Sequence, residues 1–338
     1  MKLISSIIIS IFILSLFACN QSNWEIPKEN YTVEREWIRF DLSLIEMAEN
    51  TLSAESYSQW EKEYPRFLPL YVQGVMRFGP PNQGGIQTFS QFLNDEDINE
   101  LFQKVKTTYG NSNFEQEQAQ LNKAFSRFQY HFPEAQIPEV YTFLSAFTYT
   151  TVADDSLLGI GLDMYLGKDY KTYAQAGIPK YKFKHFEREY MVADAMRAWL
   201  VSEFNRAGGS NLLSQMIYQG KIAFLMHAFL YELPDHLLIN YTQEELTWCE
   251  ENEAEIWFHF VEMELLHTME NHLIRKYMGE APFIAGFPEG SPGRVGQWMG
   301  YKIVEAFMKS NPNTTLKQLI EMENADLLLQ QSNYKPKR

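Results

Sequence analysis

Hydrophobic and polar positions follow two different periods along the chain, and the changes of period divide it into three parts. Between residues 94 and 133 apolar side chains recur every three or four positions, which predicts two helices. The first of these begins at a cap formed by Asn94 or Asp95 and stops at Gly110. Short runs rich in β-branched and aromatic residues then predict strands, and after Pro179 the helical period returns almost to the end.

The last part of the chain is expected to consist of helices joined by short loops. Capping-box patterns at Thr242 with Glu245, and at Thr315 with Gln318, mark the starts of two of them. Near the N-terminus, a stretch rich in proline and glycine over 64–85 predicts a loop-rich helical hairpin, and 37–48 begins as a strand and becomes a helix. The helices predicted after Pro179 are 183–205, 211–231, 243–276, 294–310 and 315–330.

Two strands are expected in the middle of the chain, over 139–147 and 156–167, with a turn over 148–155 between them. Gly159 and Gly161 lie inside the second strand and indicate a bulge or a close approach of another backbone. The fold class is therefore α+β and predominantly helical, with a small sheet followed by a helical half.

The 183–205 helix has one clearly apolar face. On another face, Asp194 and Arg197 are three residues apart and can pair with each other. An exposed pair of this kind contributes little to stability, but the same pair inside a cleft could hold a ligand. The apolar face, which we expect to lie in the core, contains Phe186, Tyr190, Ala193, Met196 and Leu200.

Charge narrows the range of partners. The chain has 43 acidic and 29 basic residues, a net charge of −14. Such a surface repels nucleic acid and anionic lipid, so we expect no nucleic-acid partner and no polybasic membrane attachment.

The N-terminus provides a different route to a membrane. Residues 1–18 have the features of a secretory signal peptide, because their apolar run is shorter than the roughly 20 residues that span a bilayer. The sequence Leu-Phe-Ala-Cys that ends at Cys19 resembles a lipobox, which predicts lipidation of Cys19 by acyl chains such as palmitate. The alternative is an uncleaved transmembrane anchor. Residues 19–35 would then be a lipid-anchored tether, and 36–338 a single domain.

Few residues offer catalytic chemistry. If Cys19 is lipidated, only Cys249 remains, and its helical surroundings predict a core cysteine and no disulfide. A helix binds zinc through two histidines four residues apart, and none of the seven histidines are three or four apart. A site assembled from distant residues stays open. Nucleophile-elbow and P-loop motifs are missing from the sequence, so we expect no cofactor and no metal.

Besides the lipobox, seven segments occur in a specific order along the chain: 64–72, 159–167, 190–204, 212–221, 241–262, 281–308 and 332–338. In these segments the chain resembles the gliding-motility lipoprotein GldB family of Bacteroidetes-type bacteria. The resemblance implies a role in gliding over surfaces, together with other proteins of the cell-envelope machinery that also serves secretion. The lipid predicted at Cys19 would be the only attachment to the membrane, and Asn20, with no acidic run after it, favours a position that faces the periplasm.

The same family is similar to zincin-type metallopeptidases, which implies a zincin-like topology. When 192–197 is set against the zincin motif V-H-E-x-x-H, Ala193 and Arg197 take the places of the two histidines and Asp194 that of the glutamate. Gln219 stands where such peptidases have a metal-binding glutamate. Arginine is a permanent cation that repels zinc, so the resemblance implies a relict cleft without catalysis.

Two alternatives to a non-catalytic protein remain open at this stage. One is a metal-dependent peptidase or hydrolase with an atypical site near Asp194, Gln219 and a distant histidine. The other is a peptide- or glycan-binding module that uses the relict cleft along the edge of the 157–167 strand, because an unpaired edge strand can accept a peptide as an added strand.

Overall fold

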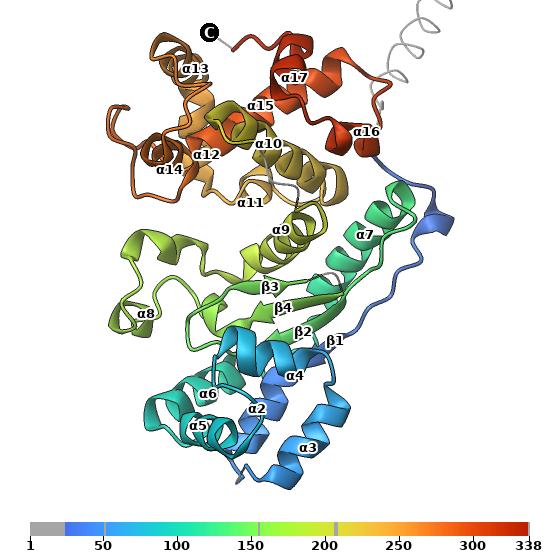
Figure 1. Cartoon of the computed structure of the whole chain (residues 1–338), viewed down its shortest axis with the longest axis vertical. Coiled ribbons are helices and arrows are strands. Elements are labelled where there is room, and N and C mark those ends of the chain that lie inside the picture. The colour runs from blue at the N-terminus through green and yellow to red at the C-terminus, as the bar shows by residue number, and fades with distance from the viewer. Residues whose placement is uncertain (1–23, 51, 155, 206–208, 337–338) are drawn as a thin grey trace, which may run out of the picture.

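The computed structural model describes residues 24–50, 52–154, 156–205 and 209–336. The predicted signal peptide and the lipidation site at Cys19 lie outside these residues. Figure 1 shows a small sheet in the middle, with N-terminal helices on one side and C-terminal helices on the other. The predicted α+β, predominantly helical class is confirmed. Among the described residues, no helix has the length and apolar character needed to cross a membrane.

The sheet has four strands in the order β1-β2-β4-β3. The first three in this order are parallel, and β3 runs antiparallel to β4 at the edge. In register, Tyr141 lies opposite Gly159, and Val152 lies opposite Gly159 from the other side. The strands are β1 (Trp37–Arg39), β2 (Glu139–Phe143), β3 (Thr151–Ala153) and β4 (Leu157–Gly161).

Two expectations about this sheet are wrong. The predicted turn over 148–155 contains strand β3, which is too short to show a period of two in the sequence. The predicted strand over 156–167 ends at Gly161, continues as the 3₁₀ helix η3 (Leu162–Tyr165), and lies between β2 and β3. The open edge next to the C-terminal half is therefore β3 and not 157–167.

The glycines of β4 allow β3 and the residues before it to pack closely against β4. A Cβ atom at Gly161 would lie 2.2 Å from the carbonyl oxygen of Tyr149, and one at Gly159 would lie 2.7 Å from Cγ2 of Val152. Both distances are too short for a side chain. The close backbone approach predicted from these glycines is present at Gly161, whereas the neighbours of Gly159 are the side chains of Val152 and Phe143.

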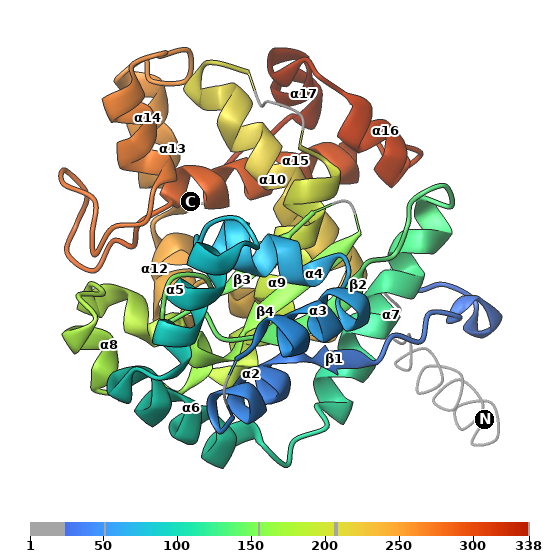
Figure 2. The same ribbon diagram turned by 60° about the horizontal axis from the view of Figure 1, so that its bottom comes forward.

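The N-terminal helices cover one face of the sheet, as Figures 1 and 2 both show. Phe40 is fully buried at their centre, with the rings of Tyr64 and Tyr71 each 5.0 Å from its own. The predicted strand-to-helix change within 37–48 is confirmed, and Asp95 caps α6 by accepting two backbone N–H groups. The elements are α2 (Phe40–Ala48), α3 (Ala54–Glu63), α4 (Phe67–Pro69), the π-helical η2 (Leu70–Val75), α5 (Gln83–Leu93) and α6 (Glu96–Tyr109).

Helix α7 (Glu115–His131) holds the N-terminal segment against the body. Gln118, Asn122 and Ser126 lie four residues apart, one turn after another along the helix. Their side-chain oxygens accept backbone N–H groups from three alternate residues: Trp37 at 3.2 Å, Arg35 at 3.0 Å and Val33 at 3.1 Å. From Trp24 onward, the segment predicted as a tether is therefore packed on the protein, and it includes the 3₁₀ helix η1 (Lys28–Asn30).

Arg127 of α7 adds a second attachment. Its side chain is almost fully buried and forms an ion pair with Glu232. It also donates to the carbonyl oxygen of Phe229 at 2.6 Å and to the hydroxyl of Tyr31 at 3.2 Å, and it lies 4.0 Å from the ring centroid of Tyr231. This arginine joins α7, the end of α10 and the N-terminal segment.

The C-terminal half packs around two helices in direct backbone contact. A Cβ atom at Gly220 of α10 would lie 2.3 Å from the carbonyl group of Gly300 in α15, so these helices need glycine where they meet. Both predicted capping boxes, at Thr242 and Thr315, are confirmed. The helices are α8 (Thr172–Gln175), α9 (Met191–Glu203), α10 (Leu212–Phe229), α11 (Asp235–Leu238), α12 (Gln243–Glu251), α13 (Glu253–Glu262), α14 (Asn271–Met278), α15 (Val295–Ser310), α16 (Leu316–Glu321) and α17 (Ala325–Ser332).

Three predicted helices are shorter or more broken than expected. The 183–205 helix begins only at Met191, because Glu187 is extended and separates the 3₁₀ helices η4 (Lys180–His185) and η5 (Arg188–Tyr190). The 243–276 helix is three helices; the side chain of Asn252 donates to the carbonyl oxygen of Trp248 at the first break. In 315–330, Asn324 caps a new helix at α17. Cys249 is fully buried, as predicted, and burial raises the pKa of its thiol.

Candidate functional site

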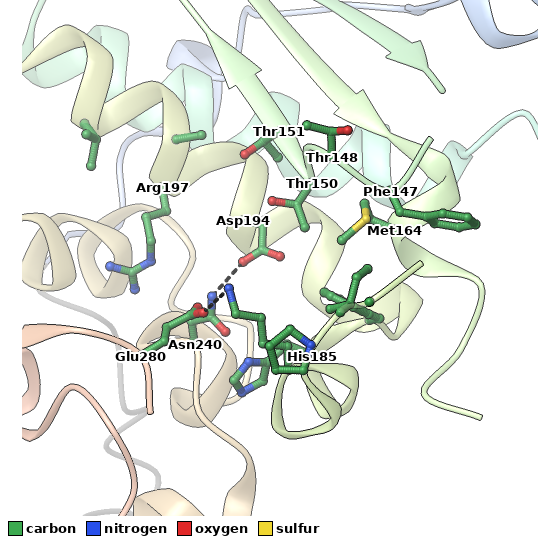
Figure 3. Close-up of a pocket in the computed structure, with 17 residues that line it drawn as sticks. Phe147, Thr148, Thr150, Thr151, Met164, His185, Asp194, Arg197, Asn240 and Glu280 are labelled. Carbon is green, nitrogen blue, oxygen red and sulfur yellow. Dashed lines mark hydrogen bonds and ion pairs between the residues drawn. The ribbon is translucent and has the colours of Figure 1, made fainter. Parts of the chain in front are cut away.

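A cavity of about 610 Å³ lies between α9, the start of β3 and the segment around 177–186. In Figure 3, Phe147 and Met164 lie at one end, Arg197 and Glu280 at the other, and Asp194 lies between them. The apolar side is lined by Phe147, Met164, Ile178 and Phe186. The polar side is lined by Lys182, His185, Asp194, Arg197, Asn240 and Glu280, and three threonines, Thr148, Thr150 and Thr151, line it from the approach to β3.

The sequence of α9 explains which of its residues reach the cavity. Its apolar stripe is buried as predicted, and the Trp199 ring packs against those of Phe125 and Phe128 at 5.0 and 4.5 Å. Because that stripe faces the core, the opposite face presents Asp194 and Arg197 to the cavity.

The carboxyl group of Asp194 is held between two donors. The buried hydroxyl of Tyr165 donates to Oδ2 at 3.0 Å, and Nδ2 of Asn240 donates to Oδ1 at 3.1 Å. Burial raises the pKa of Asp194 to about 6, against the opposing effects of the Tyr165 hydrogen bond and the charge of Arg197. Its charge therefore changes near neutral pH, in contrast to an ordinary surface aspartate.

The guanidinium of Arg197 has a different environment. Its Nη2 donates to the carbonyl oxygen of Leu238. The predicted pairing with Asp194 is wrong: among the ion pairs of the described residues, none joins Arg197 to a carboxylate, because the side chain turns to that carbonyl instead. Burial, together with the like charge of Arg294, lowers the pKa of Arg197 to about 10.

Asn240 lines the polar end and Arg294 lies behind it, beside two neighbouring small voids; both have left-handed backbone conformations, with φ of 56° and 60°. This region is tolerated by asparagine but unfavourable for arginine. A hydrogen bond from the Arg294 guanidinium to the carbonyl oxygen of Asn240 holds the two loops together, and the guanidinium lies 5.4 Å from the ring centroid of Tyr241. Such conformations are found more often at binding sites than elsewhere.

The remaining charged groups at this end are paired. Lys182 and Glu280 form an ion pair at 3.0 Å. Nε2 of His185 lies 3.6 Å from Glu245, which also pairs with Lys184 at 2.5 Å. Although burial opposes it, the nearby His185 ring and the hydrogen bond from Lys184 lower the pKa of Glu245 to about 2, while burial lowers the pKa of His185.

The structure brings together only part of the predicted relict cleft. Asp194 and Arg197 line the cavity, but Ala193 is 1% exposed and belongs to the core. Gln219 lies beside a separate void of about 10 Å³, which Arg197 and Arg294 also line.

These residues do not fit a zinc ion. Ala193 has no ligand atom, Arg197 is a cation bound to a carbonyl group, and Gln219 lies outside the cavity. In the part of the chain that the structure describes, no group of three or more His, Cys, Asp or Glu side chains is placed to share a metal.

Sequence reasoning missed most of the polar end. Tyr165, Lys182, His185, Asn240 and Glu280 come from four separate loops and 3₁₀ helices; only Lys182 and His185 share one, η4, so no spacing connects the whole set. The one usable signal was Asn240, which lies two residues before the capping box at Thr242 and so marks the end of a loop.

Comparison with known proteins identifies the family of the chain. No curated protein and no solved structure matches it. A family model described as "Gliding motility protein GldB" matches residues 21–336, nearly the full length. The chain therefore belongs to the GldB family of gliding motility proteins.

Proposed function

We propose that this protein is a lipid-anchored, non-catalytic component of the cell envelope, and that it serves gliding motility and the associated secretion machinery through protein contacts made at the cavity. Membership of the GldB family supports the role in gliding. The observation that carries the rest is the cavity itself, which combines an open strand edge, an apolar end and a partly exposed guanidinium.

Two contacts support binding in preference to catalysis. Arg197 stays a cation at neutral pH and has no lone pair for a metal, at the position that the resemblance to zincins would assign to their second histidine. Each oxygen of Asp194 already accepts a hydrogen bond, one of them from the buried Tyr165. A general base needs an oxygen that reaches the substrate proton, and a protein donor already takes one of the two acceptor positions on each oxygen.

The strand edge suggests how a partner is held. β3 pairs with β4 on one side only, and no other described strand covers its outer edge. The unpaired backbone groups of such a strand accept an extended peptide as an added strand. Because Thr150 and Thr151 line the cavity, a peptide added here would run past Asp194 and Arg197.

Crosslinking in cells tests this proposal. A photoreactive residue at the exposed Thr148 is expected to crosslink to proteins of the gliding and secretion machinery, whereas one at the exposed Lys62, on the opposite layer, is not. Equal labelling from both positions, or none from Thr148, would overturn binding at the cavity. Replacement of Cys19 by serine tests the anchor separately, since it is expected to release the protein from membranes.

One observation favours a second candidate, a hydrolase. A carboxyl group with a pKa of about 6 suits general acid–base catalysis near neutral pH, and Asp194 is such a group. Peptide hydrolysis by purified protein that is lost on Asp194→Asn would establish this function. Loss of the same activity with a chelator would add a metal.

A further inference from the structure

The guanidinium of Arg197 has hydrogen-bonding capacity that the protein does not use. Arginine has five N–H donors, and among the described hydrogen bonds Arg197 makes one, to the carbonyl oxygen of Leu238. The side chain is partly exposed and lines the cavity at the end opposite Phe147 and Met164. The remaining donors are therefore available to a molecule in the cavity.

Among the described residues, no carboxylate forms an ion pair with Arg197. The charge of Asp194 acts on Arg197 without such a contact, because the oxygens of Asp194 accept hydrogen bonds from Tyr165 and Asn240, and Glu280 is paired with Lys182. Arg294 brings a second guanidinium close enough to act on the charge of Arg197. A desolvated cation next to a like charge is unfavourable until a carboxylate or similar anion pairs with it.

We propose that Arg197 binds a carboxylate, and that the cavity thereby takes the free C-terminus of a partner polypeptide. This proposal rests on the proposed function, because it names the part of the partner that the cavity recognises. A terminal carboxylate matches the guanidinium fork with two parallel hydrogen bonds. The partner's last residues extend along β3, and an apolar side chain occupies the end lined by Phe147 and Met164.

The shape of the site favours a peptide over a carbohydrate acid. The cavity volume of about 610 Å³ falls within the roughly 300–1,000 Å³ that ligand pockets occupy. The apolar side of the cavity lies across from Arg197, whose N–H donors are largely unused. The open edge of β3, next to the cavity, offers backbone groups in the spacing of an extended chain. A uronic acid would use the cation but not the strand edge.

Synthetic peptide libraries test the proposal. Two libraries of random octapeptides, identical except that one ends in a free acid and the other in an amide, are passed over the mature lipoprotein in detergent, and the retained peptides are identified by mass spectrometry. We expect the free-acid library to be retained selectively. Individual peptides selected from it are expected to bind at least about tenfold more weakly after amidation, because they lose a charge-assisted pair.

Variants connect this preference to Arg197. Arg197→Gln is expected to remove the difference between acid and amide, whereas Arg197→Lys retains part of it, since a lysine has the charge without the fork. Arg275→Gln, at an exposed position on α14, is the matched control and is expected to retain the full difference. The comparison of acid and amide on the unaltered protein needs no variant, so it decides the proposal even if Arg197→Gln fails to fold.

The outcomes separate this proposal from the one on which it rests. Equal retention of both libraries would overturn the carboxylate site and leave the peptide-binding cavity standing. Retention of neither library would count against both. Binding of uronic-acid oligosaccharides that depends on Arg197, without binding of peptides, would replace the polypeptide partner with a glycan.

Discussion

Two arginines on neighbouring helices, Arg127 and Arg197, have different numbers of partners for their charge. Arg127 of α7 pairs with the carboxylate of Glu232, donates to the carbonyl oxygen of Phe229 and lies over the ring of Tyr231. Arg197 of α9 has one carbonyl partner and a like charge nearby. Burial alone would lower the pKa of Arg127, but hydrogen bonds with Glu232 and Tyr31 raise it above its ordinary value, whereas the pKa of Arg197 falls to about 10. Folding therefore stabilises the charged form of Arg127 and destabilises the charged form of Arg197.

The comparison teaches how to separate a structural arginine from a binding one. Burial alone does not explain the difference, because it lowers the pKa of both arginines, although Arg127 is buried and Arg197 is partly exposed. What differs is the number of partners that each folded environment supplies: among the described hydrogen bonds, Arg127 makes four and Arg197 makes one. A buried charged group with few hydrogen-bond partners lowers stability. Proteins retain such a group where a ligand supplies the missing partners.

The largest effect is expected from Arg127→Met. We expect the free energy of unfolding to fall by about 2–4 kcal/mol, because the buried hydrogen bonds to Phe229 and Glu232 and the stacking on Tyr231 are lost together. Urea denaturation of purified protein measures this. A loss below about 1 kcal/mol would remove the distinction between the two arginines.

Asp194→Asn is expected to stabilise the protein, with a dependence on pH. The folded pKa of Asp194 is raised to about 6 from 3.8, so its ionisation opposes folding as the pH rises through this interval. The stabilisation by asparagine, about 1–2 kcal/mol at pH 7.5, should therefore shrink as the pH falls and vanish near pH 4. The amide is accommodated if Asn240 turns its unpartnered Oδ1 toward it.

Melting temperatures at pH 7.5 and pH 4.5 provide the measurement. The other charged or titratable groups around Asp194 are Arg197, Arg294, Glu280, Lys182 and His185, and burial lowers the pKa of His185. Since His185 is present in both proteins, the difference between them isolates Asp194. A stabilisation that is the same at both pH values would show that the charge of Asp194 is not the cause.

Arg197→Met is expected to change stability by no more than about 1 kcal/mol. Replacing an incompletely paired, desolvated charge with an apolar group of similar size is often neutral or stabilising. The same urea denaturation, run beside Arg127→Met, tests the comparison directly. If both variants lose similar stability, Arg197 is a structural residue and its free donors have no further meaning.

The smallest effect is expected from Asn122→Ala. Asn122 both accepts from the backbone N–H of Arg35 and donates to its carbonyl oxygen, at 3.0 and 3.2 Å, in an exposed position. We expect a loss of about 0.5–1 kcal/mol, together with faster proteolysis between 24 and 36. Asn99→Ala, which removes two side-chain hydrogen bonds at the start of α6, one exposed and one partly buried, is the control and should leave that proteolysis unchanged.

The parts of the fold that sequence alone predicted are those whose causes are local. Asp95, Thr242 and Thr315 each cap the helix that follows them, and the predicted starts of these helices are confirmed. β3 was missed because three residues cannot display a period, and its position depends on pairing with β4. The 183–205 helix was extended too far because Glu187 leaves the helical conformation without a proline or glycine to signal it.

In the candidate site, too, the sequence predicted the features with local causes and missed those that depend on tertiary packing. Asp194 and Arg197 share a helix, so their spacing placed them on one face, and both line the cavity. Their predicted pairing failed because the direction of Arg197 is set by the carbonyl oxygen of Leu238, some 40 residues later. Asn240 and Glu280 reach the cavity only through the packing of the C-terminal half, which no local pattern describes.

The packed N-terminal segment has a mechanical consequence. Beyond Trp24 the chain passes along α7 and becomes β1, one edge of the sheet, while the opposite edge is β3 beside the cavity. With a lipid at one end and a partner on β3, a pull between them would first load the contacts of Trp24, then the side chains of α7, and then the hydrogen bonds across all four strands. The sheet would thus be the element in tension, and its backbone pairing would set the load that the protein transmits.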